Sequence, residues 1–321
     1  MMKSIDVFNG DADGICALHQ LRLHEPQPDA RLVSGVKRDI TLLDQLTDVS
    51  NSTITVLDIS LDRNRDSIEK ILTHSNTVFY ADHHYAGTIP SSDRLMAHID
   101  PDPLTCTSLI VNSLLAEEYG PWAVTGAFGD NLDEPALKLA ARLGLETDAT
   151  ELLKETGILL NYNGYGASLS DLFFSPAELY RQVQPFTDPL AFAAESPALQ
   201  ILRSGYRKDM ERAMSFAPIH EDNGGRIFDL PAEPWARRVA GVYSNTLARQ
   251  QPALAHALLT ANKDGSLRIS VRAPLQNRTG ADTLCRKFPS GGGRAAAAGI
   301  NELPAEQLDT FIKAFSSQFT I

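Results

Sequence analysis

The chain has 321 residues, of which 43% are hydrophobic, 7% aromatic and 21% charged, the proportions of a globular protein with one or two domains. Its 29 Lys and Arg against 40 Asp and Glu give a formal net charge of −11, which argues against a protein that grips long DNA or RNA by its phosphates. No apolar run approaches the roughly 20 residues needed to span a bilayer, and the first residues lack an apolar signal core. We therefore expect a cytoplasmic protein without a membrane segment. Its three scattered cysteines predict no disulfide framework.

The first half alternates strand-like and helix-like segments. A strand is predicted over residues 4–9, followed by a turn at 10–14 and a helix over 15–24. The alternation continues with strands over 31–36, 52–60, 77–84 and 122–130, which are followed by helices over 42–46, 67–74, 103–120 and 135–145. Strands separated by crossover helices predict an α/β fold, with a mostly parallel sheet and helices on both faces.

Acidic residues follow four of these predicted strands: Asp11 and Asp13, then Asp58, then Asp82 with His83 and His84, and finally Asp130. In open α/β sheets, ligands bind at the edge where the strands end. Carboxylates gathered there repel one another unless a cation lies among them. Carboxylates with imidazole and no thiolate suit Mn²⁺, or Mg²⁺, better than structural zinc. Because the ligands are too many for one ion, we expect two divalent ions with one bridging carboxylate.

Each cluster alone also has an ordinary structural explanation. The aspartates of the 10–14 turn could cap the following helix, Asp58 could cap another, His83 and His84 could simply end a strand, and Asp130 could begin a helix. The recurrence of all four clusters at strand ends favours the metal site.

The sequence resembles the DHH phosphoesterase superfamily, whose members cleave phosphoester or phosphoanhydride bonds with two metal ions. The resemblance rests on GDADG at 10–14, VLD at 56–58, ADHH at 81–84 and GD at 129–130, and later on LRISVRA at 267–273 and SGGGRAAAAGI at 290–300. It implies a catalytic domain over 1–187 and a smaller C-terminal α/β domain over 216–321 that binds substrate. Between them, residues 188–215 predict a helical linker, interrupted at Ser196 and Pro197.

The resemblance also implies roles for single residues. Asp11 would bind one metal ion and Asp13 the other, Asp58 would bridge them, and His83 and Asp130 would complete the second site. Asp82 would orient an imidazole, while His84 would face the substrate phosphate or protonate the leaving oxygen. Relatives often carry a histidine or a further aspartate near the first pair, where this chain has Val7 and Asn9. Asn9 could offer a neutral oxygen, which makes the first site less anionic.

Two further segments are candidates for substrate binding. Gly291, Gly292 and Gly293 would let backbone N–H groups approach an anion, so with Arg294 they predict a phosphate cradle at a helix start. Arg294 stands where the family usually has histidine. A surface turn is the alternative for this segment. Arg268 and Arg272 share one face of a predicted strand, and we favour Arg272 for the substrate. Tyr162, Asn163 and Tyr165 could bind a base or pack a loop onto the core.

Together these features predict a metal-dependent phosphodiesterase that acts on very short linear nucleotides (nanoRNA), with dinucleotides such as pGpG as leading candidates. A 3′-phosphoadenosine 5′-phosphate phosphatase and a pyrophosphatase are rival enzymes. A non-catalytic nucleotide sensor is the alternative of a different class. Long nucleic acid is not an expected partner, and a homodimer is left open.

Overall fold

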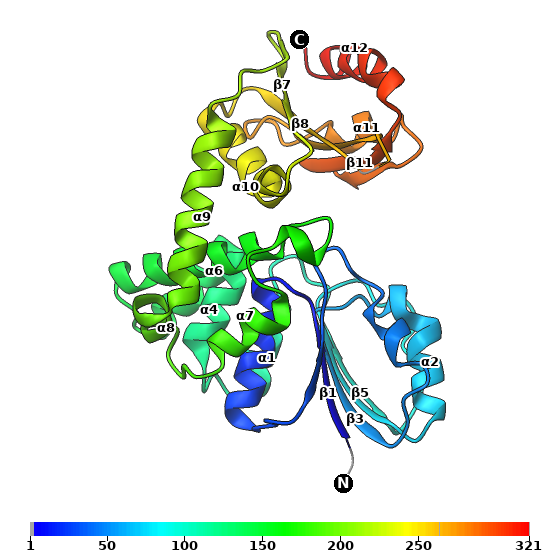
Figure 1. Cartoon of the computed structure of the whole chain (residues 1–321), viewed down its shortest axis with the longest axis vertical. Helices are drawn as coiled ribbons and strands as arrows, with labels where there is room; N and C mark the ends of the chain where they lie inside the picture. The colour runs from blue at the N-terminus through cyan, green and yellow to red at the C-terminus, as the bar shows by residue number, and fades with distance from the viewer. Residues whose placement is uncertain (1–2, 263, 321) are drawn as a thin grey trace. The chain divides into compact units, whose positions relative to one another are not determined.

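The computed structural model describes residues 3–262 and 264–320, which form two compact units, residues 1–204 and 205–321 (Figure 1). The division falls inside helix α9 (Pro197–Met214), which follows helix α8 (Pro189–Glu195) directly. The predicted break at Ser196 and Pro197 is therefore present. Helix α8 packs into the first unit, where the ring of Phe192 lies 5.9 Å from that of Trp122.

The first unit is built on a sheet of five strands in the order β2-β1-β3-β4-β5, all of them parallel. The strands are β1 (Lys3–Phe8), β2 (Arg31–Val33), β3 (Ser52–Leu57), β4 (Thr77–Asp82) and β5 (Leu95–Ile99). The register pairs Phe8 with Leu57 and Leu57 with Ala81, so that β1, β3 and β4 end at one level. The predicted parallel α/β sheet is confirmed, while β5 is an additional edge strand that the sequence pattern did not reveal.

Helices cover both faces of this sheet (Figure 1). One face packs against α2 (Arg65–Thr73) and two 3₁₀ turns, η1 (Leu42–Leu46) and η2 (Asp62–Asn64), through buried aliphatic side chains such as Val56, Leu43 and Ile68. The other face carries α1 (Ala12–His24), α3 (Thr107–Leu114), α4 (Gly120–Gly129), α5 (Asp133–Arg142), α6 (Thr147–Gly164), a 3₁₀ turn η3 (Leu169–Asp171) and α7 (Pro176–Val183).

Residues 122–129 form most of helix α4, and Asp130 caps its C-terminus, so the predicted strand over 122–130 is wrong. Every residue from Trp122 to Gly129 is buried, because neighbouring helices surround α4, and a helix buried all round shows no polar face that would reveal its period. Close packing depends on glycine here. A Cβ atom on Gly129 would lie 2.2 Å from that of Ala12, and one on Gly157 would lie 2.2 Å from the carbonyl oxygen of Thr125. These contacts bring the end of α4 close to α1.

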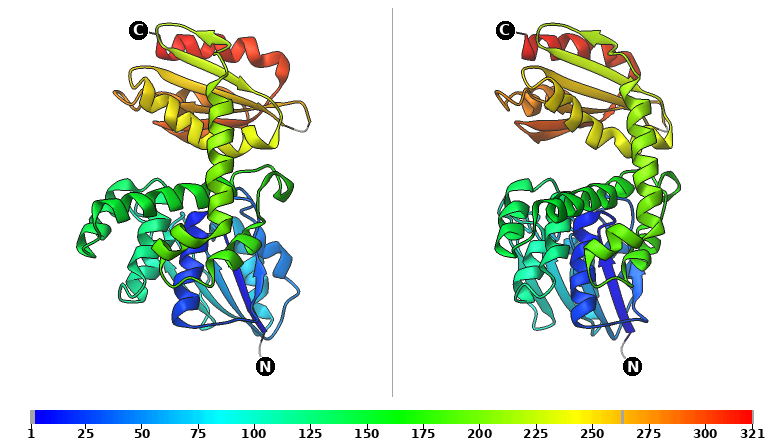
Figure 2. Two further views of the ribbon diagram at one scale, coloured as in Figure 1. Left: turned by 60° about the vertical axis from the view of Figure 1, so that its left-hand side comes forward. Right: turned by 90° about the vertical axis from the view of Figure 1, so that its left-hand side faces the viewer.

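The second unit contains a six-stranded sheet in the order β10-β11-β9-β8-β7-β6, in which only β7 and β8 run parallel. Its strands are β6 (His220–Glu221), β7 (Gly225–Leu230), β8 (Ala255–Ala261), β9 (Leu267–Arg272), β10 (Gly291–Arg294) and β11 (Ala297–Leu303). One face of this sheet packs against α11 (Ala281–Cys285) and α12 (Leu308–Phe319), and the other face packs against α10 (Pro234–Gln250) (Figure 2). A 3₁₀ turn, η4 (Ala305–Gln307), precedes α12. The predicted α/β character of this unit is confirmed.

Among the described residues, no helix combines the length and apolar character needed to cross a membrane. The thiols of Cys16, Cys106 and Cys285 are buried and unpaired with one another.

Candidate metal centre

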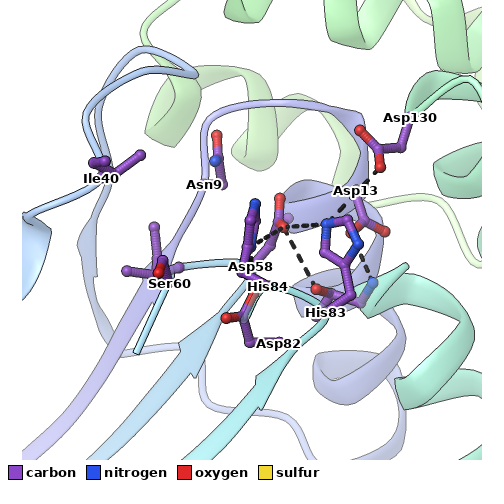
Figure 3. Close-up of polar contacts among 12 residues, drawn as sticks. Asn9, Asp13, Ile40, Asp58, Ser60, Asp82, His83, His84 and Asp130 are labelled. Atoms are coloured by element: carbon purple, nitrogen blue, oxygen red, sulfur yellow. Dashed lines mark hydrogen bonds and ion pairs between the residues drawn. The ribbon is translucent and has the colours of Figure 1, made fainter. Parts of the chain in front are cut away.

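Polar side chains gather where β1, β3 and β4 end (Figure 3). Asp11 and Asp13 lie at the start of α1, Asp58 directly follows β3, and Asp82 is the last residue of β4. Asp130 joins them from the end of α4 rather than from a strand. The sequence-based expectation that these residues meet at one edge is thus matched by the structure, although Asp130 arrives by a different route.

Asp58 is the central carboxylate of this group. Its Oδ1 atom lies 3.4 Å from Nε2 of His83 and 3.8 Å from Nδ1 of His84. Its backbone has a φ of 58°, a left-handed conformation that aspartate tolerates better than most residues and that is enriched at functional sites. Burial, followed by the charges of the neighbouring carboxylates, above all Asp11 and Asp13, raises the pKa of Asp58 well above its usual value.

His83 is oriented by the backbone. Its Nδ1 atom donates a hydrogen bond to the carbonyl oxygen of Thr105 at 3.1 Å, which leaves the lone pair on Nε2. Nε2 faces Asp58 at 3.4 Å and Oδ2 of Asp130 at 3.8 Å. Two donor atoms that are each about 2.1 Å from one ion lie roughly 3 to 4.2 Å apart. One ligand atom from each of Asp58, His83 and His84 lies within 4.8 Å of the others, which suits a single divalent cation, while Asp130 flanks this group at 3.8 Å from His83.

Asp82 and His84 form a hydrogen-bonded pair beside this group. Nδ1 of His84 donates to Oδ1 of Asp82 at 2.6 Å, and Asp82 is fully buried. Burial alone would lower the pKa of His84, but the hydrogen bond to Asp82 and the charges of Asp82 and Asp58 raise it. Because Nδ1 is engaged, His84 offers only Nε2 to a ligand, and 43% of its side chain is exposed.

Asp13 is held by the start of α3. Its carboxylate accepts hydrogen bonds from the backbone N–H groups of Thr107, at 2.8 Å, and Ser108, at 2.7 Å, and from the hydroxyl of Ser108. Both of its oxygens are therefore used to satisfy N–H groups that have no partner within the helix. This arrangement gives Asp13 a structural role that the sequence did not indicate.

Asp11 caps α1, the ordinary explanation that its sequence context left open. Its Oδ1 atom accepts a hydrogen bond from the N–H of Gly14 at 3.1 Å, and its Oδ2 atom lies 2.6 Å from Nζ of Lys37. Burial would raise the pKa of Asp11, but the Lys37 ammonium and these hydrogen bonds hold it below the usual value. In turn, Asp11 outweighs the effect of burial on Lys37 and raises the pKa of that ammonium well above its usual value.

Lys37 and Asn161 were missed at the sequence level. Nζ of Lys37 donates to Oδ1 of Asn161 at 3.1 Å and lies 3.3 Å from Oδ1 of Asp130. A signal was present in the sequence, because Lys37 follows the predicted strand over 31–36 and basic residues at that edge meet the carboxylates. Asn9 lies nearby: its amide nitrogen donates to the carbonyl oxygen of Lys37 at 3.3 Å, and its Oδ1 atom is buried without a hydrogen-bond partner in the described part of the chain.

The structure separates the three residues proposed to bind a base. Tyr162 is fully buried, with its ring 6.0 Å from that of Phe173, and Asn163 is fully buried with its amide bonded to the backbone of Phe174. Tyr162 and Asn163 match the alternative of packing onto the core, because α6 continues through Gly164 and holds them there; their contact with a base stays a prediction. Tyr165 lies beyond the helix end, with its ring 5.6 Å from Nζ of Lys37.

In the second unit, the glycine segment differs from its predicted conformation. Residues Gly291–Arg294 form strand β10, which pairs antiparallel with β11, so the predicted helix start is wrong. Gly293 has a φ of 135°, and a Cβ atom there would lie 2.5 Å from Cα of Ala298, which explains the need for glycine. Arg294 is exposed at the edge of the sheet. Arg272 ends β9, where its Nε donates to Oδ1 of Asn245 at 2.8 Å.

The sequence matches no family model and no curated protein. Its structure is similar to that of an exonuclease RecJ bound to manganese, with a TM-score of 0.63 and 15% identity over 98% of this chain and 89% of that one. It is also similar to the pGpG-specific phosphodiesterase PggH of Vibrio cholerae, with a TM-score of 0.56 and 14% identity over 99% and 100% of the two chains. A DHH-domain protein described as a member of the s1p family of ribosomal proteins gives a TM-score of 0.66 at 14% identity, over 98% and 86%.

These similarities extend over both units of the chain and define its class of fold. The chain has the fold of DHH-domain proteins, as the motifs in its sequence predicted.

Proposed function

We propose that this protein is a metal-dependent phosphodiesterase that hydrolyses very short linear oligonucleotides, with dinucleotides such as pGpG as the leading candidates. The observation that carries the proposal is the group formed by Asp58, His83 and His84 at the ends of the strands, with Asp130 3.8 Å from His83. These donors match Mn²⁺ first and Mg²⁺ second. When bound, a divalent cation would lower the pKa of a water molecule and offset the negative charge of a phosphate.

The chain's own residues position this chemistry. The carbonyl oxygen of Thr105 fixes the tautomer of His83, so that Nε2 stays available as a donor atom. Asp82 holds His84 by its Nδ1–H and stabilises the protonated ring. We assign His84 the transfer of a proton from Nε2 to the leaving oxygen of the phosphodiester. Asp13 keeps α3 against α1, which holds Thr105 and His83 in place.

The preference for short substrates is supported by charge and by similarity of fold. A net charge of −11 disfavours long polyanions, which bind through many basic contacts. The similarity to the pGpG-specific phosphodiesterase covers 99% of this chain and 100% of that one. We propose that Arg272, Arg294 and the backbone of Gly291–Arg294 bind the non-scissile parts of the substrate, since guanidinium groups suit phosphates.

The proposal is tested by turnover of a set of substrates with Mn²⁺: pGpG, other linear dinucleotides, 3′-phosphoadenosine 5′-phosphate, a 20-nucleotide RNA and pyrophosphate. We expect dinucleotides to have the highest kcat/KM. Preference for 3′-phosphoadenosine 5′-phosphate or pyrophosphate would establish one of the rival enzymes. Tight binding of a dinucleotide without turnover would establish a nucleotide sensor and refute the proposal.

A further inference from the structure

The ammonium group of Lys37 occupies a site made of oxygen atoms. An ammonium group has three N–H donors, and Nζ of Lys37 meets three oxygens: Oδ2 of Asp11 at 2.6 Å, Oδ1 of Asn161 at 3.1 Å and Oδ1 of Asp130 at 3.3 Å. Two carboxylates and a neutral amide oxygen are the donors that a hard divalent cation would use. A side chain of the protein thus makes the contacts expected of a metal ion.

The position of Lys37 is set by the backbone around it. Its N–H donates to the carbonyl oxygen of Gly164 at 2.9 Å, and its own carbonyl oxygen accepts from the side chain of Asn9. The preceding residue, Val36, is buried, and the ring of Tyr165 lies 5.6 Å from Nζ. These contacts tie the segment to β1 and to the end of α6, so Lys37 is built into the centre.

The same contacts occupy oxygens that a second metal ion would use. Oδ1 of Asp11 is bonded to Gly14 and Oδ2 to Lys37, while both oxygens of Asp13 are bonded to the start of α3. Val7 is fully buried in the apolar core, so position 7 supplies no ligand. The side chain of Asn9 keeps a buried oxygen without a hydrogen-bond partner among the described residues, but this oxygen is neutral.

We propose that Lys37 takes the place of one of the two metal ions, so that the centre binds a single divalent ion beside Asp58 and His83. A unit positive charge that is permanently part of the chain replaces a dissociable ion of charge +2. This inference rests on the proposed function for the ion that remains, but it makes a separate claim about the number of ions.

The number of ions can be counted by native mass spectrometry and by electron paramagnetic resonance of the full chain saturated with Mn²⁺. We expect one Mn²⁺ per wild-type chain and the six-line spectrum of an isolated Mn²⁺ ion. Lys37→Met removes the charge at nearly constant length and should admit a second ion. Lys37→Arg keeps the charge and should bind one. Lys154→Met is the matched control, since Lys154 is similarly exposed and is paired with Asp133, and within the described residues it forms no ion pair with Asp11 or Asp130. This variant should also bind one ion.

Each outcome decides the inference. Two Mn²⁺ ions in the wild-type chain, or an exchange-coupled spectrum, would overturn it whether or not Lys37→Met folds. A single ion in both wild type and folded Lys37→Met would show that Lys37 does not exclude the second ion. Turnover of pGpG by the same samples separates the two proposals: two ions with turnover refute only the inference, and one ion without turnover refutes only the proposed function.

Discussion

Asp13 offers a test of whether this aspartate supports the fold in addition to any contact with metal. The substitution Asp13→Asn keeps the shape of the side chain but replaces one acceptor oxygen with an NH₂ group. Because the backbone N–H groups of Thr107 and Ser108 each require an acceptor, one of them is left facing a donor in the core. A hydrogen bond to a charged group contributes about 1.5 to 3 kcal/mol, and an unsatisfied buried donor costs about 1 to 3 kcal/mol. We expect a loss of about 3 kcal/mol in the free energy of unfolding.

The assay is thermal unfolding of the metal-free protein in chelator, followed by the fluorescence of Trp122 in a Trp235→Phe background. Trp122 is fully buried in the first unit and therefore reports on it alone. For a unit of about 200 residues the loss corresponds to a decrease in Tm of about 6 to 12 °C. The exposed Asp133→Asn is the control and should change stability by less than about 0.5 kcal/mol. An Asp13→Asn variant as stable as this control would refute the structural role.

Three further predictions concern titrating groups. Because burial and neighbouring carboxylates raise the pKa of Asp58, its ionisation opposes folding above the usual carboxyl pKa, and Asp58→Asn should raise the Tm of the metal-free protein at pH 8 but not near pH 4. His19 donates from Nε2 to the carbonyl oxygen of Phe186 at 2.7 Å, and burial lowers its pKa to about 4. Its protonation therefore favours unfolding, and between pH 6.5 and pH 4 the wild type should lose about 3 kcal/mol relative to His19→Gln; urea titrations that remain parallel would contradict this. Asp82→Asn removes the charge that raises the pKa of His84, so the alkaline limb of the turnover profile should move to lower pH, and an unmoved limb would exclude His84 as the acid.

The sequence was informative where a strand ends in a carboxylate. The runs that precede Asp11, Asp58 and Asp82 are apolar and rich in β-branched residues, so both the strands and their shared edge could be predicted. The parallel register then follows from the crossover helices. For these residues, local sequence and tertiary structure agree.

Other features depend on contacts between distant segments. Other helices surround the helix that contains Trp122 and Phe128, and apolar residues occupy all of its sides. Its sequence therefore cannot be distinguished from that of a buried strand. The pairing of Lys37 with Asp11 and Asp130 joins three separate segments, so the position of Lys37 after a predicted strand indicated the edge of the sheet but not its partners. Tyr162 seemed suited to a loop because glycines follow it, yet the helix continues past it to Gly164.

The glycine segment shows a similar limit. Three glycines indicate that side chains are not tolerated there, which the structure explains at Gly291 and Gly293 by close contacts with Cys285 and Ala298. The same composition suits a loop before a helix and an edge strand, and pairing with β11 decides between them. The need for glycine was therefore predictable, while the conformation was not.

The most direct test of the proposed activity is the appearance of GMP from pGpG with Mn²⁺, measured by chromatography for the wild type and for Asp58→Asn. Asparagine preserves the size of Asp58 and tolerates its positive φ, so the fold should be maintained while the central charged donor is lost. We predict two GMP per pGpG for the wild type and a decrease of at least about a hundredfold in kcat/KM for the variant. Absence of GMP in the wild type, or equal rates in both proteins, would contradict the assignment of this centre as the site of phosphodiester hydrolysis.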